Sequence, residues 1–406
     1  MTEAARPSRR RFLGYLSGAA AGAAVASPVT ALAVGRDGAA EPTGPATPMT
    51  SVSPHGAHQP GVTVATQRFG DLVALDLLPG TDRDALARLM RLWTGDVVAL
   101  TAGRPAPGDT APELATANAD LTITVGWGPG VFTLRGLEGA RPAGLADVPP
   151  MRHDELEEGW SGGDLLLHVA AGDGTTVAHA VRRLVQDAAP FARLRWRQHG
   201  FWNGVDAEGR AVTGRNLFGQ VDGSANPQPG TPLFDETVWA RDPGWFVGGT
   251  TVVVRRIRMN LTTWDELTRQ EQEAAIGRRL SDGAPLTGGR ERDDVDLMEF
   301  GDAGPVIPMH SHVRMSHPHM NGGARIFRKG INYTHDTVVD GVPQTEAGLL
   351  FLSYQADVAR QFTPIQQRLD HADALNEWTT AIGSAAFAVL PGFGPGGWLG
   401  DSLLGE

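Results

Sequence analysis

The sequence of 406 residues contains no cysteine. This absence excludes disulfide bonds, cysteine-ligated zinc, cysteine-ligated iron–sulfur clusters, thiolate-ligated haem and cysteine nucleophiles. A chain without disulfides has to be stabilised by its hydrophobic core. The chain is long enough to bury one large core or two medium ones, so we expect one large domain or two medium domains.

The sequence also lacks an excess of positive charge: 35 lysines and arginines face 46 acidic residues, which gives a formal net charge of −11. Sequence-independent binding to nucleic acid or to anionic lipid needs a cationic surface. The local basic stretch of Arg193, Arg195 and Arg197 does not reverse the overall balance. We therefore expect no nucleic-acid partner.

A long hydrophobic run is missing as well. The uncharged run 14–26 is too short and too rich in alanine and glycine to span a membrane, and Pro28 follows it. Residues 8–13 read Ser-Arg-Arg-Arg-Phe-Leu and residues 31–33 read Ala-Leu-Ala. This pattern is typical of a twin-arginine export signal with a small-x-small cleavage site, and a chance arginine cluster is the alternative.

Residues 1–33 are therefore predicted to be a signal peptide, with the twin-arginine export machinery as a partner. The mature protein would be extracellular, in the cell wall or periplasmic, and without a stable membrane span. Because this route carries folded proteins, often with a cofactor already inserted, the signal favours a redox or metal enzyme. Residues 34–57 are rich in Pro, Gly, Ala, Ser and Thr without apolar periodicity, which predicts a flexible leader.

The first half of the remaining chain alternates strand and helix patterns. Apolar or alternating runs predict strands, and apolar residues at helical spacing predict helices; the segments in order are strand 72–78, helix 86–95, strand 121–127, strand 164–170 and helix 177–184. This order suggests a ferredoxin-like α+β unit with its helices on one face of the sheet.

The second half repeats this order. Residues 251–257 and 348–354 are strand-like, Thr263 is a candidate cap for a helix through Leu267, and the apolar residues 362, 365 and 369 follow a helical stripe. Residues 164–167 and 348–351 resemble each other, which indicates a weak internal duplication. We expect an α+β fold of two ferredoxin-like domains, residues 58–240 and 241–406.

Two loop-rich stretches, 204–242 and 282–320, contain most of the candidate catalytic and metal-ligating residues. In 218–227, glycines on both sides of Asp222 allow the backbone to turn sharply and to approach a flat ligand, although an Asp-Gly pair is often only a turn. In 310–319, four of the 12 histidines fall within ten residues: His310, His312, His317 and His319. Imidazole binds zinc, copper, nickel or iron, and a structural zinc or copper site is the alternative interpretation.

Together these motifs resemble the dye-decolourising peroxidase family. Its Gly-x-x-Asp-Gly motif corresponds to 219–223, and its string of small residue, His, aliphatic residue and Arg corresponds to 311–314. Its later Arg before Lys-Gly corresponds to Arg328. The resemblance covers about residues 58–400, and several motifs in the same order make it specific.

The resemblance implies two ferredoxin-like domains of the dimeric α+β barrel type, with haem b in the C-terminal domain. His312 would bind the iron, and Asp373 would accept the other ring N–H of His312; His310, two residues away, is the alternative ligand. Asp222 and Arg328 would be the catalytic residues. The resemblance also assigns haem contacts to Gly223, Arg328, Leu350, Leu352 and Asp373.

The function that this resemblance implies is an exported haem peroxidase that reduces hydrogen peroxide and oxidises dyes, phenols or other one-electron donors. Asp222 would carry a proton between the two peroxide oxygens. The alternative is a haem-binding deferrochelatase that serves iron uptake. Gln220 stands where the family often has an aromatic residue, so peroxide access or packing at the haem edge is expected to differ.

Bulky donors would be oxidised at the surface through aromatic side chains. The candidate relay residues are Tyr333, Tyr354, Trp378 and Trp398, with ordinary core aromatics as the alternative interpretation. No sequence feature points to an oligomeric state or to the physiological donor.

Overall fold

The structure is a computed structural model that describes residues 51–117, 119–208, 210–302, 304–339 and 341–405. The predicted signal peptide and residues 34–50 of the predicted leader lie outside the described residues. The last residues of the predicted leader, 51–57, are described, and they contact the rest of the chain. His55 pairs with Phe393 in parallel, and their rings meet edge to face at 5.1 Å, so this contact fixes the segment against the C-terminal end of the chain.

The first half of the chain forms a four-stranded antiparallel unit. Its strands follow the order β4-β1-β3-β2, and one helix connects β1 to β2 while another connects β3 to β4. The bounds are β1 (Phe69–Leu77), α1 (Arg83–Thr101), β2 (Thr122–Trp127), β3 (Leu165–Ala171), α2 (Gly174–Ala188) and β4 (Ala192–Phe201). This is the split βαβ arrangement predicted for a ferredoxin-like unit.

The second half repeats the arrangement with the order β10-β5-β9-β8. The bounds are α3 (Pro232–Val238), β5 (Thr250–Met259), α4 (Leu261–Asp265), α5 (Arg269–Ile276), β6 (Phe300–Gly301), β7 (Gly304–Pro305), α6 (His312–Ser316), β8 (Phe327–Val339), β9 (Val342–Gln355), α7 (Thr363–Ala372), β10 (Thr379–Val389) and α8 (Asp401–Leu404). The similar segments 164–167 and 348–351 fall at the start of β3 and in the middle of β9, which are the third strands of the two units. The α+β fold with two ferredoxin-like domains is therefore confirmed.

The two units close one eight-stranded barrel, β1-β3-β2-β10-β5-β9-β8-β4. β10 meets β2 through two residue pairs and β8 meets β4 through one, whereas the strands within each unit pair over longer stretches. One hydrophobic cluster draws residues from both units, among them Leu72, Leu166, Val252, Leu352 and Phe387. The interior of the barrel is thus a core that the two halves share.

Two helix boundaries differ from the sequence patterns. α1 continues through Gly95 to Thr101, because Leu86, Met90, Trp93 and Val97 pack on the sheet and tertiary burial outweighs the helix penalty of one glycine. Thr263 does not cap a helix but lies inside α4, whose N-cap is Asn260.

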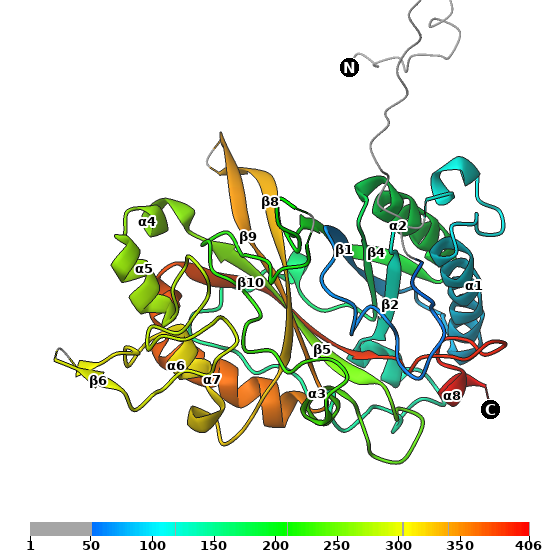
Figure 1. The fold of residues 1–406 in the computed structure, drawn as a ribbon. Coiled ribbons are helices and arrows are strands. Elements are labelled where there is room, and N and C mark those ends of the chain that lie inside the picture. The colour runs from blue at the N-terminus through cyan, green and yellow to red at the C-terminus, as the bar shows by residue number, and fades with distance from the viewer. Residues whose placement is uncertain (1–50, 118, 209, 303, 340, 406) are drawn as a thin grey trace, which may run out of the picture. The chain divides into compact units, whose positions relative to one another are not determined.

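Helices cover the outer faces of the strands. Figure 1 shows α1 and α2 together beside the N-terminal strands, and α4 to α7 grouped at the far end of the C-terminal strands. None of the helices in the described ranges combines the length and apolarity needed to cross a bilayer. The short helix α6 and helix α7 contact each other, and together with residues of the segments 216–228 and 278–295 they line a cavity of this half.

Candidate active site

The main cavity has a volume of about 410 Å³, a size typical of small-molecule and cofactor sites. It lies against the outer face of the C-terminal strands. Its apolar wall consists of side chains from β5, β9, α7 and the following turn, chiefly Ile257, Met259, Leu349, Phe351, Phe362, Ile365, Leu369 and Leu375. Polar residues from the same turn and from the segments 216–228, 278–295 and 312–328 complete its lining, and the sequence-predicted residues Asp222, His312, Arg328 and Asp373 are all among them.

The alternation of side chains along β9 separates two of the predicted cofactor contacts, Leu350 and Leu352, from the main cavity. Leu349 and Phe351 line the main cavity, whereas Leu350 and Leu352 belong to the cluster inside the barrel and are 1% and 0% exposed. Successive side chains of a strand point to opposite faces, so neighbours in sequence cannot share the cavity wall. The predicted cofactor contacts Leu350 and Leu352 therefore lie on the face of β9 that is turned away from the main cavity.

The loop that carries Asp222 depends on its two glycines. Gly219 and Gly223 have φ values of 79° and 120°, a region that side chains other than glycine rarely adopt. The Asp222 N–H donates to the carbonyl of Gly214 at 2.9 Å, which fixes the turn. Gly223, which was predicted to contact the cofactor, does not line the main cavity; its position serves the turn and exposes the Asp222 side chain to the cavity.

A side-chain clamp joins this loop to β8. Asn226 donates to the carbonyl of Arg328 at 2.7 Å, and the Arg328 N–H donates to the Asn226 side chain at 3.1 Å. The clamp brings Arg328 Nη1 to 3.5 Å from Asp222 Oδ1. Asn216 donates to the second oxygen, Asp222 Oδ2, at 3.4 Å. The carboxylate is therefore held at the cavity wall by a cation on one side and an amide on the other.

His312 begins α6 and faces the main cavity from another side. Its Nδ1 lies 2.6 Å from Asp373 Oδ2, and Asp373 Oδ1 accepts the Leu375 N–H at 3.0 Å. Because an ionised carboxylate only accepts hydrogen bonds, Nδ1 is the donor in this contact, and in the neutral imidazole this leaves the lone pair on Nε2. The Asp373 side chain is only 4% exposed. An imidazole oriented by a buried carboxylate is the usual arrangement of a metal-ligating histidine.

The four histidines of 310–319 do not form one site. His312 and His317 line the main cavity, whereas His310 lines a different cavity behind Asp373. His317 Nε2 lies 2.9 Å from Asp294 Oδ1, and His319 is exposed. Within the described ranges no three histidine, aspartate or glutamate side chains come together to hold a metal ion. This separation favours His312 over His310 as the residue that presents a lone pair to the main cavity.

Positive charge gathers on part of the cavity wall. Arg278, Arg292, Arg325 and Arg328 all line it. Burial lowers the pKa of the Arg278 guanidinium, and the nearby charge of Arg328 lowers it further. Arg278 donates hydrogen bonds to the carbonyls of Gly283 and Glu291, so it holds the 283–291 loop in place. Guanidiniums grouped in this way favour an anionic ligand or ligand substituent.

The lining as a whole fits a haem. A broad apolar wall suits the macrocycle, a carboxylate-oriented imidazole suits the iron, and the arginines suit two carboxylate substituents. The sequence reasoning missed Asn226, Asn216 and Arg278, which position these groups. The dipeptide Asn226-Pro227 after the Asp-Gly turn was the available signal for the first of them.

The candidate relay residues lie in three different places. Tyr333 and Tyr354 are buried inside the barrel, at 0% and 1% exposure. Trp398 packs near the N-terminal core, with the Arg91 guanidinium 4.2 Å from its ring centre. Trp378 lines the cavity behind Asp373. Of the four, only Trp378 borders either of the two cavities.

Comparison with known proteins gives one consistent result. Residues 59–202 match the family description "Dyp-type peroxidase, N-terminal", and residues 213–393 match "Dyp-type peroxidase, C-terminal". A dye-decolorizing peroxidase of Thermobifida fusca is 41% identical over 365 residues, which cover 86% of this chain and 84% of that protein. A deferrochelatase of Yersinia pestis is 35% identical over 369 residues, with 86% and 84% covered.

Solved structures agree. A DyP-type peroxidase from Cellulomonas bogoriensis superimposes with a TM-score of 0.82 at 46% identity, covering 88% of this chain and 99% of that one. Ferric DtpA from Streptomyces lividans superimposes with a TM-score of 0.84 at 41% identity, covering 88% and 98%. The similarity therefore spans both halves of the barrel and every segment that lines the main cavity.

Proposed function

The chain belongs to the Dyp-type peroxidase family and is a haem-dependent peroxidase, and from this premise we propose that its main cavity binds haem b and reduces hydrogen peroxide. The electrons come from dyes, phenols or other one-electron donors. The observation that carries the proposal is that the His312–Asp373 pair and the Asp222–Arg328 pair face the same cavity.

His312 would hold the cofactor through Nε2, because Nδ1 is committed to Asp373. The apolar side chains of β5, β9 and α7 would pack on the macrocycle, and the arginine-rich part of the wall would bind its carboxylates. When bound, haem supplies a redox-active iron that hydrogen peroxide can oxidise. The negative charge of Asp373 makes the His312 imidazole a stronger donor to that iron.

Asp222 would move the proton that cleavage of the peroxide O–O bond requires. Its carboxylate accepts a proton from one peroxide oxygen and returns it to the other, which leaves as water. The side chain is suited to this task because it is 11% exposed and is fixed by Arg328 and Asn216. The Arg328 guanidinium would stabilise the negative charge that develops on the departing oxygen.

Peroxide-dependent oxidation of a phenol by the haem-loaded protein tests the proposal. The Asp222→Asn variant removes the proton acceptor with little change in shape, and we expect the bimolecular rate with peroxide to fall about 10²–10⁴-fold. The Asp265→Asn variant changes an exposed carboxylate at the end of α4, outside the cavity, and should react like the parent. A parent protein with full haem that consumes no peroxide would refute the proposal.

A second function is supported by the similarity to the Yersinia deferrochelatase. In that function the protein would release iron from haem and leave the porphyrin intact. The two functions give different products from the same holoprotein. Metal-free protoporphyrin that forms without peroxide would favour iron release, whereas an oxidised donor formed at the expense of peroxide favours the peroxidase.

We also propose that the protein is exported by the twin-arginine route, on the basis of residues 8–13 and 31–33. Cell fractionation tests this. We expect a mature form that begins after Ala33 outside the cytoplasm, and retention of the uncleaved chain when Arg9 and Arg10 are both replaced by lysine. Export of the double variant at the parent level would contradict the assignment.

A further inference from the structure

Gln220 is a residue of the main cavity whose polar group the reaction described above does not use. It stands two residues before Asp222, lines the main cavity and is 9% exposed. A phenylalanine ring at this position would present only carbon and hydrogen to a ligand, whereas a carboxamide presents one oxygen acceptor and two N–H donors. Gln220 therefore adds hydrogen-bonding capacity to the cavity wall beside Asp222.

The loop that carries Gln220 is anchored to the core. The Asn216 N–H donates to the Gln220 carbonyl at 3.1 Å, which closes the loop on itself. Phe218, between them, is 4% exposed and stacks on Trp264 with ring centres 4.3 Å apart. Trp264 Nε1 also donates to the Phe218 carbonyl at 3.3 Å. The backbone that carries Gln220 is therefore held in place without a ligand.

Asn216 fixes the orientation of the Gln220 carboxamide. Its own Oδ1 accepts the Phe218 N–H at 3.1 Å, so the two hydrogens of Nδ2 remain for other acceptors. Nδ2 lies 3.1 Å from Gln220 Oε1 and 3.4 Å from Asp222 Oδ2. Because a donor has to meet an acceptor, Gln220 presents its oxygen to Asn216. The Nε2 amino group of Gln220 is therefore turned away from Asn216.

This amino group is available to a ligand. Among the described residues, no protein group accepts a hydrogen bond from Gln220 Nε2, and the nitrogen keeps some accessible surface. Gln220 lines the main cavity, so that surface belongs to the cavity wall. A donor in a nearly buried position gains a hydrogen bond when a ligand with an acceptor atom binds beside it.

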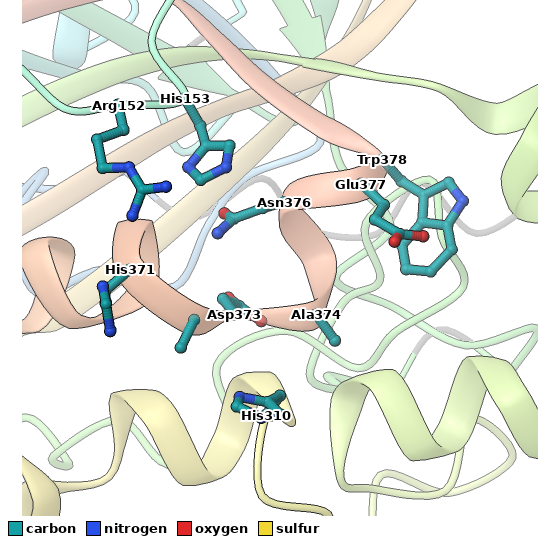
Figure 2. Close-up of a pocket in the computed structure, with 10 residues that line it drawn as sticks. Arg152, His153, His310, His371, Asp373, Ala374, Asn376, Glu377 and Trp378 are labelled. Atoms are coloured by element: carbon teal, nitrogen blue, oxygen red, sulfur yellow. The ribbon is translucent and has the colours of Figure 1, made fainter.

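The cavity behind Asp373, which Figure 2 shows, has no part in this arrangement. Its lining residues lie within 152–153, at 310 and within 371–378, and none comes from the segment 216–222. A ligand that accepts a hydrogen bond from Gln220 therefore belongs to the main cavity.

The polar groups around Asp222 are arranged on two sides of its carboxylate. Arg328 Nη1 lies 3.5 Å from Oδ1, and Asn216, which also holds Gln220, lies at Oδ2. Hydrogen peroxide both donates and accepts hydrogen bonds, so it needs donors as well as the acceptor that Asp222 provides. Arg328 supplies a donor on the Oδ1 side, and Gln220 supplies one on the Oδ2 side.

We propose that Gln220 is a specificity-determining residue of the main cavity: its Nε2 donates a hydrogen bond to the small ligand that lies beside Asp222, and Asn216 positions this donor. The inference rests on the proposed peroxidase function, in which that ligand is hydrogen peroxide. The same donor favours small anions that accept hydrogen bonds, such as fluoride. Gln220 transfers no proton, because a carboxamide is neither acidic nor basic near neutral pH, so the proton transfer stays with Asp222.

Fluoride binding tests the donor without turnover. Fluoride is titrated into the ferric haem-loaded protein in the absence of peroxide, and the haem absorbance reports the dissociation constant. We expect Gln220→Leu to raise the dissociation constant about tenfold, because one hydrogen bond to an anion is lost. Gln220→Glu keeps the shape of the side chain but replaces the donor by a negative charge, so it should raise the constant further. A purely structural role predicts the reverse order, with the Glu variant closer to the parent.

Gln270 provides the matched controls, because it is exposed on α5 and lies outside the main cavity. Gln270→Leu and Gln270→Glu make the same changes of size and charge and should bind fluoride like the parent. Equal fluoride affinity in Gln220→Leu and the parent would overturn the inference, and so would a haem-loaded parent that does not bind fluoride.

A double-mutant cycle tests the positioning role of Asn216. We expect Asn216→Ala to weaken fluoride binding, because the Gln220 carboxamide loses the contact that orients it. The variant with both Asn216→Ala and Gln220→Leu should bind only slightly more weakly than Gln220→Leu alone, since the two residues act through one donor. Fully additive losses would show that Asn216 does not act through Gln220. The Gln220 variants alone decide whether the donor exists if Asn216→Ala does not fold.

Stopped-flow mixing with hydrogen peroxide separates this inference from the proposed function. We expect the bimolecular rate with peroxide to fall about tenfold in Gln220→Leu, less than in Asp222→Asn, because a hydrogen bond is lost but the proton acceptor stays. If the parent does not react with peroxide, the proposed function has failed, and the fluoride titration still decides the role of Gln220. If the parent reacts and Gln220→Leu reacts equally fast, peroxide is not the ligand of Gln220.

Discussion

Replacement of Asp373 by asparagine isolates the contribution of the carboxylate behind His312. Asn has the shape of Asp but no charge, so the 2.6 Å contact with His312 Nδ1 loses its ionic character while the turn at the end of α7 stays in place. The Asp373 side chain is 4% exposed and that of His312 is 20% exposed, so solvent screens this interaction little.

The expected size of the effect follows from two independent considerations. Removal of the partner of a metal-ligating histidine typically costs 10–100-fold in affinity, or about 1.4–2.8 kcal/mol. A hydrogen bond to a charged group contributes about 1.5–3 kcal/mol. Both lead to the same expectation: haem dissociates from Asp373→Asn about 10–100 times faster than from the parent.

Transfer of haem to excess apomyoglobin, followed by absorbance, measures this rate directly. Asp370→Asn is the matched control, three residues earlier on α7. Its carboxylate accepts the N–H groups of Arg152 and His153 and makes no bond to His312, so the variant should lose some stability but release haem within about threefold of the parent. Equal dissociation rates for Asp373→Asn and the parent would refute the role of Asp373, and equally fast release from both variants would reduce it to general destabilisation.

Three further predictions test other parts of the structure. Arg328→Leu should slow the reaction with peroxide about 10²–10³-fold in stopped-flow mixing, since it removes the cation beside Asp222, and an unchanged rate would exclude that role. Burial raises the pKa of Asp96 to about 8, and a hydrogen bond to Asp187 and repulsion from its charge contribute. Between about pH 4 and 8 the folded state therefore binds more protons than the unfolded state, so the free energy of unfolding falls as pH rises. Asp96→Asn should therefore gain stability over the parent in urea unfolding at pH 8 relative to pH 5, and a difference that does not depend on pH would contradict this. Leu352→Ala should cost about 2–5 kcal/mol of stability and leave haem affinity unchanged, because Leu352 lies inside the barrel. Phe351→Ala should weaken haem binding, because Phe351 lines the main cavity. The reverse result would mean that the faces of β9 are assigned wrongly.

The fold was predictable where burial leaves a regular pattern. β1, β3, β5 and β9 are the strands with the plainest apolar runs, and the sequence locates all four. β4 contains Arg193, Arg195 and Arg197, with Leu194 exposed between the first two and Trp196 buried between the last two. It resembled a basic surface stretch because its exposed side chains dominate the composition. β8 was hidden by Arg328 and Lys329, which occupy opposite faces of one strand.

The sequence located the motifs of the candidate site but could not show which face of a strand borders the cavity. Asp222, His312, Arg328 and Asp373 come from four separate segments, and the sequence brought them together only through the resemblance to a family. The sequence could not show that Leu350 points away from the cavity, because a buried strand is apolar on both faces. Nor could it show that the rings of Phe218, Trp264 and Trp378 pack together, since these contacts join residues that are far apart in the chain.

Lys329 shows how the residue beside a catalytic group can serve the fold. It points into the barrel and donates to the carbonyls of Gly61 and Val64, so it connects the segment that precedes β1 to β8. Burial lowers its pKa to about 7. The Arg-Lys-Gly motif thus combines a cavity residue and a structural residue in adjacent positions.

The haem content of His312→Ala tests the central claim most directly. The pyridine haemochromogen assay and the Soret absorbance, measured after reconstitution with one equivalent of haem, compare this variant with the parent and with His310→Ala. We predict one haem per chain in the parent and in His310→Ala, and loss of the bound Soret spectrum in His312→Ala with partial return on addition of imidazole. Full haem loading and an unchanged spectrum in His312→Ala would contradict the account.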